Sequence, residues 1–512
     1  MTFLHDVDVC VVGSGFGGGP AALRSAQAGA SVVVLEQGAR HDDREGAVAF
    51  KQTQTEIDHL LDIFQVSVGL DLETGAASVV AGGRGLGGGS LVYSMVSLRA
   101  PSFVFEDPVW PDGLDRPTLD PYYARAEEQL GVVQLQWSGT PGVDDWRVSS
   151  MRDAAFATMC ERAGVSCDPV PVAINDRCAN LGWCTTGCVR HGKNSVDLRY
   201  LQPAEDLGAV LHTGIKVTSL RPADRGDGRR WRVQTDHGEV LADHVVVSAG
   251  AVGTPALLLS SADMLPGGLS GHLGRNLSRG GDMMIPVLLP EALGLPDLEM
   301  LPGKIIGSCS FQYLFEPPPG FGSDWQRFIL QPMMVLPMIS ALITADPDGI
   351  TSDGGDMRTF GEGQKHLMSH WGSRLLHVGV MGMDGMDGDV QVVGGLPLVN
   401  YRTSDRTRAL FRAARAAVHH IFDRGAGGRA LPSLDELRPD TVAIHPLGSA
   451  RMADTAAQGA VDRAGRVYRA DGSVHEGLHV ADASLMSSPI GVNTPLPTAA
   501  PCEMVAEPLL SG

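Results

Sequence analysis

The sequence has few cysteines and no excess of positive charge, and each shortage excludes a class of protein. Eight cysteines among 512 residues are too few for a disulfide-bonded scaffold, so we expect reduced thiols. Lysine and arginine number 40 against 59 acidic residues, and the formal net charge of -19 disfavours binding to nucleic acid or to anionic lipid. A polyanionic partner is therefore not expected.

The sequence also lacks a targeting segment and an uninterrupted membrane-spanning run. The N-terminus, MTFLHDVDVCVVGSG, enters a strand pattern at once and has no basic n-region or small-residue cleavage site, which predicts an unprocessed cytoplasmic protein. The longest uncharged run, residues 328–345, contains Gln331, Pro332 and Pro337. These residues favour a buried strand or pocket wall over a membrane helix, so no integral span is expected.

The N-terminal segment has the order of strand, glycine turn, helix and second strand that is typical of dinucleotide binding. Gly13, Gly15 and Gly18 form GxGxxG directly after DVCVV. The first glycine permits a tight turn, the second lets backbone approach a pyrophosphate, and the third lets the helix pack on the strand. Glu36 ends the run SVVVLE, where an acid accepts hydrogen bonds from ribose hydroxyls. This motif alone leaves NAD and FAD as alternatives.

A second glycine-rich stretch, GGRGLGGGSLVYSMVSLRAP, occupies residues 82–101. Such a run is needed where backbone approaches a flat or anionic group, or turns through positive φ. A nicotinamide site does not require it. Further on, ADHVVVSAGAVGTPALLLSS from Ala242 predicts a buried strand, a turn, and a helix opened by Thr254-Pro255.

Three elements follow in order near the C-terminus: IHPLGSARM (444–452), GLHVADASLM (477–486) and SPIGVNTPLPTAAPCEMVAE (488–507). Asp482 follows a short buried strand and is costly to bury without hydrogen-bond donors. Asn493 precedes Thr494-Pro495, and the prolines predict a rigid loop rather than a helix start. His445 lies among apolar residues, where a packed core imidazole is the simplest interpretation in isolation.

Taken together, these motifs resemble the glucose-methanol-choline (GMC) family of FAD-dependent oxidoreductases, most closely its cholesterol oxidase-like bacterial branch. The resemblance spans Val9 to Ala506 and is weakest from about Leu289 to Thr441. It implies FAD as the cofactor, with the 82–101 loop under the pyrophosphate and flavin ring and the strand at Val217 against adenine. The cofactor contacts that we predict are Gly13, Gly15, Gly18, Glu36, Gly85, Gly88, Gly89, Ser90, Val217, Asp482, Asn493 and Pro495.

The resemblance implies an α/β fold with two domains. One is a Rossmann-like FAD-binding domain of the GMC type, and the other is a substrate-binding domain built on an antiparallel or mixed sheet. We expect the FAD domain from residues 1–115, 195–285 and 440–512. The substrate domain is expected from residues 116–194 and 286–439.

In the GMC family a histidine, with a second histidine or an asparagine, faces flavin N5, and the matching pair here is His445 and Asn493. Alcohol oxidation removes a hydroxyl proton and a carbon-bound hydride; the flavin takes the hydride, so the protein supplies a base. Histidine, with an ordinary pKa of about 6.5, suits this role. Asn493 then donates to the substrate oxygen as alkoxide character develops.

Some features depart from the family pattern. The usual Asn-Gly pair after the glycine cluster is Tyr93-Ser94 here. Related steroid enzymes carry a pocket glutamate that isomerises the product, and a loose alignment puts Gln331 at that position, so we expect oxidation without coupled isomerisation. Soft apolar surface for a bulky substrate, or simply core packing, explains the methionines Met333, Met334, Met338, Met381, Met383 and Met386.

A cysteine-containing loop, DRCANLGWCTTGCVRHGKNS, invites a metal-site interpretation. Cys178, Cys184, Cys188 and His191 have a spacing that fits no common zinc or iron–sulfur pattern. We therefore expect a packed loop and no metal.

The expected function is FAD-dependent oxidation of an alcohol to a carbonyl, on a bulky hydrophobic or sterol-like alcohol. Molecular oxygen or another acceptor would reoxidise the flavin. The alternatives are a sugar or glycoside oxidase or dehydrogenase of the same family, a NAD-dependent dehydrogenase, and a flavin-binding protein without turnover. The NAD alternative leaves residues 82–101 and the Asn493 loop unexplained. The oligomeric state and the substrate remain open.

Overall fold

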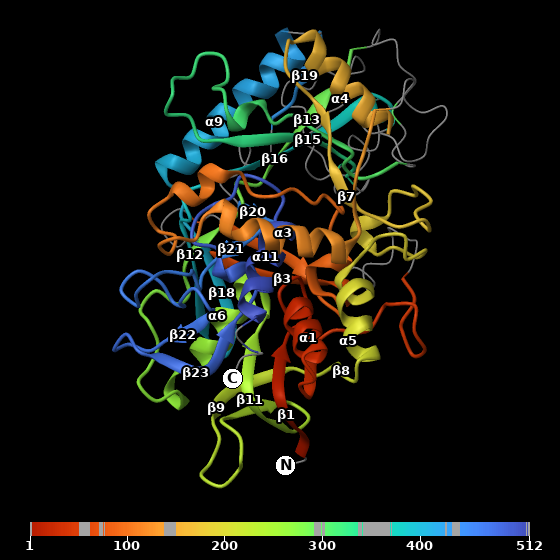
Figure 1. The fold of residues 1–512 in the computed structure, drawn as a ribbon. Coiled ribbons are helices and arrows are strands. Elements are labelled where there is room, and N and C mark those ends of the chain that lie inside the picture. Colours follow the sequence, from red (N-terminus) through yellow and green to blue (C-terminus); the bar gives the residue numbers. More distant parts are fainter. Residues whose placement is uncertain are drawn as a thin grey trace.

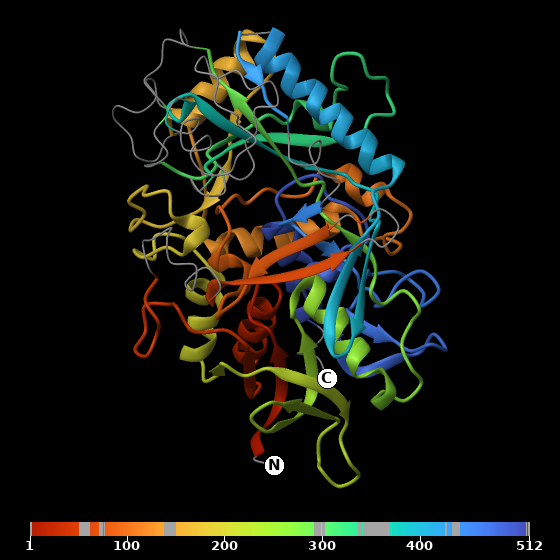
Figure 2. The ribbon, with the colours of Figure 1, turned by 180° about the vertical axis from the view of Figure 1, so that it is seen from behind.

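Figures 1 and 2 show the fold of a computed structural model, with one large sheet in the lower half and a second sheet in the upper half. The structure describes residues 3–50, 62–70, 75, 77–137, 150–290, 298, 303–335, 340, 369, 371–424, 427–432, 441–507 and 509. This mixed α/β architecture with several sheets confirms the expected fold class.

The larger sheet has eight strands. Its strands are, in spatial order, β22 (Arg466–Tyr468), β23 (Val474–Val480), β11 (Glu239–Val247), β1 (Phe3–Val12), β2 (Val32–Glu36) and β8 (Val210–Thr213), with β10 (Trp231–Thr235) and β9 (Val217–Pro222) extending from β11. The run from β23 to β8 is parallel. Every residue of β2 is buried, as expected for a parallel strand covered on both faces.

Two helices from opposite ends of the sequence pack together beside this sheet. They are α1 (Gly18–Gln27), which also contacts β1 and β2, and α11 (Pro495–Ala506). A Cβ at Gly18 would collide with the carbonyl oxygen of Gly13. Glycine at this position therefore lets α1 lie close to β1, and the predicted order of strand, turn, helix and strand is confirmed.

The second sheet is antiparallel and carries its own core. Its order is β15 (Phe328–Met333), β16 (Leu375–Gly382), β13 (Met283–Leu288) and β19 (Arg429–Ala430), and it contacts α4 (Met151–Arg162) and α9 (Asp405–His419). In Figure 1, α9 crosses this sheet at the top of the molecule. Phe156 of α4 and Leu410 of α9 are fully buried against the sheet.

Two smaller sheets bring His445 into place. One has the order β18 (Leu396–Tyr401), β17 (Gly388–Val393), β12 (Arg275–Ser278) and β21 (Leu447–Gly448), and the other has β20 (Thr441–Ala443), β4 (Ala77–Gly83) and β3 (Phe64–Leu70). His445 therefore lies in the short link between β20 and β21, and each of these strands is anchored in a different sheet.

The remaining elements connect these layers. They are α3 (Arg116–Leu130), α5 (Gln202–Asp206), α6 (Gly250–Ser260), the strand pairs β5 (Val132–Gln134) with β7 (Pro171–Ala173) and β6 (Asp168–Pro169) with β14 (Ser308–Cys309), and the short helices η1 (Gly88–Leu91), η2 (Ser102–Glu106), η3 (Cys184–Thr186), η4 (Asp197–Leu201), η5 (Ala262–Met264), η6 (Gln312–Leu314), η7 (His420–Arg424) and η8 (Ala483–Leu485). The domain division stays a prediction. Helix α3, from the expected substrate domain, packs against α11 of the expected FAD domain, and β13 crosses the expected boundary at residue 285.

Two predictions about proline are wrong. The segment after Asn493 is a helix start, because Pro495 is the first residue of α11, where its missing N–H and fixed φ are tolerated. Pro255 does not open α6, which begins at Gly250. Proline in the second turn leaves the carbonyl of Ala251 without its helical donor, and the Ser449 hydroxyl donates to that oxygen at 2.6 Å.

The uncharged run from residue 328 forms the buried strand β15 in its first part, as expected, while Pro337 and Met338 lie outside the described residues. Among the described helices, none has the length and apolar character needed to cross a bilayer.

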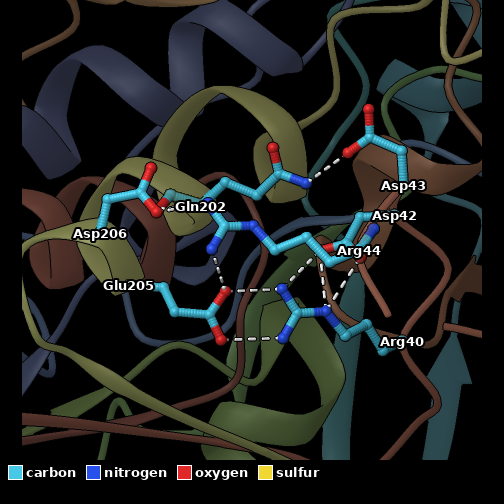
Figure 3. A network of polar contacts seen from close by, with 7 residues as sticks. All are labelled: Arg40, Asp42, Asp43, Arg44, Gln202, Glu205 and Asp206. Carbon is cyan, nitrogen blue, oxygen red and sulfur yellow. Dashed lines mark hydrogen bonds and ion pairs between the residues drawn. The ribbon is translucent and has the colours of Figure 1, made fainter. Parts of the chain in front are cut away.

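The loop that follows β2 is tied to α5 by a network of charged side chains (Figure 3). Arg40 forms two hydrogen bonds with the Glu205 carboxylate, at 2.9 and 2.7 Å, and Arg44 donates to Asp206 at 2.6 Å. In the same loop Ala39 accepts a backbone hydrogen bond from Leu86 at 2.8 Å. The network therefore fixes the chain after Glu36 on α5, and the backbone hydrogen bond joins the same loop to the second glycine-rich stretch.

Candidate active site

The two glycine-rich turns face each other. Gly13 has φ +93°, and a Cβ there would collide with the Ser248 carbonyl at the end of β11. A Cβ built on Gly88 would lie 2.8 Å from the Cα of Gly15, whereas a Cβ at Gly89 would meet open space. The two turns thus form a cradle lined by backbone, which fits a pyrophosphate and a flat ring system.

Glu36 lies at the carboxyl end of β2, as predicted, and is buried. The Ser14 hydroxyl donates to one carboxylate oxygen at 2.6 Å, and the Gly38 N–H donates to the other at 2.9 Å. Burial raises the pKa of Glu36 against the effect of these hydrogen bonds. Ile215 donates to the Glu36 carbonyl at 3.0 Å, so the half-buried Val217 begins its strand close to this corner.

The second glycine-rich loop is fixed from within. Gly85 has φ +132°, and the Ser90 hydroxyl donates to the Gly87 carbonyl at 2.7 Å and accepts from the Val196 N–H at 2.8 Å. Ser90 is completely buried. Its hydroxyl therefore shapes the loop, while the backbone of Gly88 and Gly89 borders the cradle.

Lys193 is a buried cation beneath this loop that the sequence reasoning did not assign. Its Nζ donates to the carbonyls of Leu91 at 2.6 Å and Cys184 at 2.7 Å, and lies 5.2 Å from the centre of the Tyr93 ring. Burial lowers the pKa of Lys193 to about 8. Tyr93, which replaces the family's asparagine, donates to the Asn194 carbonyl at 2.5 Å and packs edge-on against Phe16.

Asp482 has the donors that its burial requires. Ser484 donates through its N–H at 2.8 Å and its hydroxyl at 2.5 Å, while Gly250 N–H and the Thr254 hydroxyl donate to the second oxygen at 2.8 and 2.5 Å. Burial raises the pKa of Asp482 despite these four hydrogen bonds. The carboxylate therefore joins the start of α6 to the segment that leads to Asn493.

His445 is held by Asp282, a residue that the sequence analysis missed. One carboxylate oxygen lies 2.7 Å from His445 Nδ1, and the other accepts the backbone N–H groups of Ile444 at 2.7 Å and His445 at 2.8 Å. The side chains are 17% and 10% exposed. Burial opposes a charged imidazole, but the Asp282 carboxylate outweighs it and raises the pKa of His445.

Asn493 and Gln331 form a buried amide pair. Gln331 Nε2 donates to Asn493 Oδ1 at 2.9 Å, and the two residues are 0% and 1% exposed. Asn493 Nδ2 and Gln331 Oε1 have no hydrogen-bond partner among the described residues. The pairing therefore leaves the Asn493 amide with N–H groups for another molecule, which is the orientation that a donor to a substrate oxygen needs.

Apolar side chains border the site. A Cβ on Gly491 would meet Met383 Cγ at 3.2 Å and Leu314 Cδ2 at 3.6 Å, and a Cβ on Gly448 would meet Met386 Cε at 2.6 Å. Two of the predicted methionines thus pack beside the turns that carry Asn493 and His445. In contrast, the Met333 sulfur lies against Gly379 within the second sheet.

The cysteine loop shows free thiols at Cys178, Cys184 and Cys188. Within the described ranges, no three His, Cys, Asp or Glu side chains are grouped closely enough to hold a metal ion. Burial raises the pKa of Cys184 to about 12.

The parallel sheet and its glycine cradle are typical of a dinucleotide-binding domain. The GMC oxidoreductase family matches with its N-terminal part over residues 24–279 and with its C-terminal part over residues 388–501. The chain therefore belongs to the GMC oxidoreductase family. This match confirms the predicted family, whose members are FAD-dependent oxidoreductases that act on alcohols, and it favours FAD over the NAD-dependent alternative.

Two of the curated relatives are named as oxidases. A long-chain-alcohol oxidase of Arabidopsis thaliana is 26% identical over 95% of this chain and 65% of its own length. A cholesterol oxidase of Mycobacterium tuberculosis is 30% identical over 59% of this chain and 56% of its own length. The chain thus spans between 56% and 65% of the length of these two relatives.

Solved structures share the fold along nearly the whole chain. Pyridoxine 4-oxidase from Mesorbium loti superposes with a TM-score of 0.66 at 18% identity, covering 98% of both chains. A formate oxidase of Aspergillus oryzae has a TM-score of 0.69 at 15% identity, covering 100% of this chain and 99% of its own. These structures establish the fold alone.

The residues of this chain fit FAD. A Cβ on Gly88 would collide with the backbone of Gly15, Gly89 borders open space, and α1 begins beside the cradle without an acidic residue in its first turn. A phosphate at that helix start meets N–H groups and no repelling carboxylate. These observations agree with the cofactor that GMC oxidoreductases bind.

Proposed function

We propose that this protein oxidises an uncharged, hydrophobic alcohol to the carbonyl with FAD, using His445 as the general base and Asn493 as a donor to the reacting oxygen. The observation that carries this proposal is the pair of buried polar groups prepared for these two tasks. His445 is bonded through Nδ1 to Asp282, and the Asn493 N–H groups have no partner in the described part of the chain.

Bound FAD would supply the hydride acceptor, and the side chains would handle the proton. With Nδ1 bonded to Asp282, Nε2 is the imidazole atom that can accept the hydroxyl proton. Asn493 Nδ2 would donate to the same oxygen, where negative charge grows as the proton leaves. The protein thus removes the proton and stabilises the oxygen from two sides.

The surroundings support a neutral, apolar substrate. Met383 and Leu314 pack beside Gly491, two residues before Asn493, and Gln331 supplies a free amide oxygen rather than a charge. The names of the relatives, long-chain-alcohol oxidase and cholesterol oxidase, agree with this chemistry. Because an amide does not act as a carboxylate base, we propose that a sterol substrate is oxidised without double-bond isomerisation.

An anaerobic substrate panel tests the proposal. The purified protein, checked for flavin absorption, is mixed without oxygen with a long-chain alcohol, a sterol, a sugar and a carboxylated aryl alcohol. We expect the first two to bleach the flavin and the others to react slowly. Readmitting air and measuring peroxide shows whether oxygen is the acceptor. Flavin that no alcohol bleaches would indicate a binding protein, and faster bleaching by the sugar would overturn the proposed substrate class.

A further inference from the structure

The chain reaches Asp282 through a turn that only glycine allows. β12 and β21 pair antiparallel, with Leu277 opposite Gly448 and Ser278 opposite Leu447. After β12 the chain passes through Gly280 and Gly281, with φ of +76° and +65°. These left-handed conformations fold the next residue, Asp282, back toward the link before β21.

Close packing explains both glycines. A Cβ on Gly280 would lie 2.8 Å from the Cβ of His445, and a Cβ on Gly281 would lie 2.5 Å from the carbonyl oxygen of Gly382. Neither distance is compatible with a side chain. The turn is thus built to bring its backbone into contact with His445 and the end of β16.

The opposite side of the turn is also anchored. Asp384 accepts the Ser278 hydroxyl at 2.7 Å and the Arg279 N–H at 2.8 Å. The Tyr401 hydroxyl donates to the Ser278 carbonyl at 3.1 Å. These hydrogen bonds therefore hold the turn that carries Asp282 independently of the contact between Asp282 and the imidazole.

We propose that Asp282 is a positioning residue of the reaction, which holds His445 in the tautomer that keeps the proton on Nδ1 and leaves Nε2 free to accept the substrate proton. This inference rests on the proposed role of His445. An ionised carboxylate only accepts hydrogen bonds, so the imidazole nitrogen beside it must carry the hydrogen. When Nε2 takes a proton, the same carboxylate stabilises the imidazolium that forms.

A purely structural role is the competing interpretation, because Asp282 also binds two backbone N–H groups. The two roles differ in their effect on proton affinity. Asp282 is the one charged side chain in the described stretches that shifts the pKa of His445. Asp384 and Arg279, which flank the same turn, do not shift it; they act, together with Asp282, on the Tyr401 phenol. Removal of the Asp282 charge leaves burial alone, which lowers the pKa of the imidazole.

Asp282→Asn tests the positioning role. Asparagine keeps the shape, but its amide can donate to Nδ1 and so select the tautomer with the proton on Nε2. We expect anaerobic flavin reduction to slow by about 10²- to 10⁴-fold, by analogy with general-base loss and wrong-tautomer variants of catalytic triads. We also expect its acidic limb to move down by about one pH unit or more, the usual effect of one neighbouring charge.

A readout without turnover accompanies the rates. Carbethoxylation of His445 by diethyl pyrocarbonate, followed by peptide mass spectrometry across pH, reports the proton affinity of the imidazole directly. In Asp282→Asn its midpoint should fall with the kinetic limb. The matched control is Asp384→Asn, which loosens the same turn and keeps the Asp282 charge, so its midpoint should not move. Asp282→Glu should retain the wild-type midpoint and recover part of the rate, even if Asp282→Asn fails to fold.

An unchanged carbethoxylation midpoint in Asp282→Asn, an equal shift in Asp384→Asn, or a glutamate variant with a lowered midpoint would overturn the positioning role. Failure of the proposed function looks different. If no alcohol reduces the wild-type flavin, or if His445→Ala reduces flavin normally, then His445 is not the general base. The carbethoxylation comparison still reports in that case whether Asp282 sets the proton affinity of His445.

Discussion

The side chain of His445 is held by a carboxylate, whereas the side chain of Asn493 is held by another amide. The first contact joins Asp282 to Nδ1 at 2.7 Å, and the second joins Gln331 to Oδ1 at 2.9 Å. Both fix one polar atom and, in the proposed function, leave the other for a substrate. Only the charged contact also changes how readily its partner takes a proton.

In the proposed function, this difference separates two tasks. The histidine must gain and lose a proton, so a neighbouring charge tunes it as well as orienting it. The asparagine stays neutral and only has to point its N–H groups correctly. We therefore expect changes around His445 to alter both rate and pH dependence, and changes around Asn493 to alter rate alone.

His445→Ala should have the largest effect, because it removes the base. We expect FAD to stay bound and anaerobic flavin reduction by a true substrate to slow by about 10²- to 10⁴-fold. Stopped-flow absorbance of the flavin band measures the rate. A near-normal rate would show that another group accepts the proton, and the proposed difference between the tasks of His445 and Asn493 would no longer hold.

Asn493→Leu should have the next largest effect, because it removes the donor to the developing alkoxide. Loss of one such donor costs about 10²- to 10³-fold in rate. Reduction rates measured across pH should fall by the same factor at every pH, since His445 and Asp282 are untouched. A shifted acidic limb would show that the amide also influences the imidazole.

The pH dependence of the wild-type protein follows from the raised pKa of His445. A base must be unprotonated to act, so flavin reduction should rise with pH and level off above the pKa. That pKa should lie above the ordinary histidine value of about 6.5. Below it, the rate should fall about tenfold per pH unit, since one protonation controls the step. A limb below pH 6 would contradict the influence of Asp282.

The cofactor half of the molecule could be predicted from the sequence because its signals are local. Gly13, Gly15, Gly18 and Glu36 follow one another at fixed spacings along one strand, turn, helix and strand, and the structure has these elements in that order. Gly13 and Gly18 record close backbone approaches directly, since a Cβ at either position would collide with a carbonyl oxygen.

The neighbours of His445 and Asn493 could not be predicted in the same way. Asp282 lies 163 residues from His445, and Gln331 lies 162 residues from Asn493. No periodicity links such pairs, because tertiary contacts bring them together: β12 pairs with β21 near Asp282 and His445, and β15 meets the segment before α11 at Gln331 and Asn493. The double glycine before Asp282 was a usable signal of a tight turn. Proline misled us at Pro495, since it starts a helix as readily as it stiffens a loop.

Gln331→Leu should have the smallest effect of these changes and gives the sharpest test of the comparison. Leucine removes the donor to Asn493 Oδ1 and leaves that buried acceptor unpaired, at a cost of about 1–3 kcal/mol. The Asn493 amide is then no longer fixed, and it can present its oxygen instead of its N–H groups to the substrate. We expect flavin reduction to slow about tenfold, equivalent to about 1.4 kcal/mol, with the same acidic limb as the wild type.

Stopped-flow pH profiles of Gln331→Leu and Asp282→Asn are recorded side by side. Both variants should reduce flavin more slowly, by different factors, and only Asp282→Asn should shift the acidic limb. If both variants move it, the two contacts form one coupled unit rather than two separate devices.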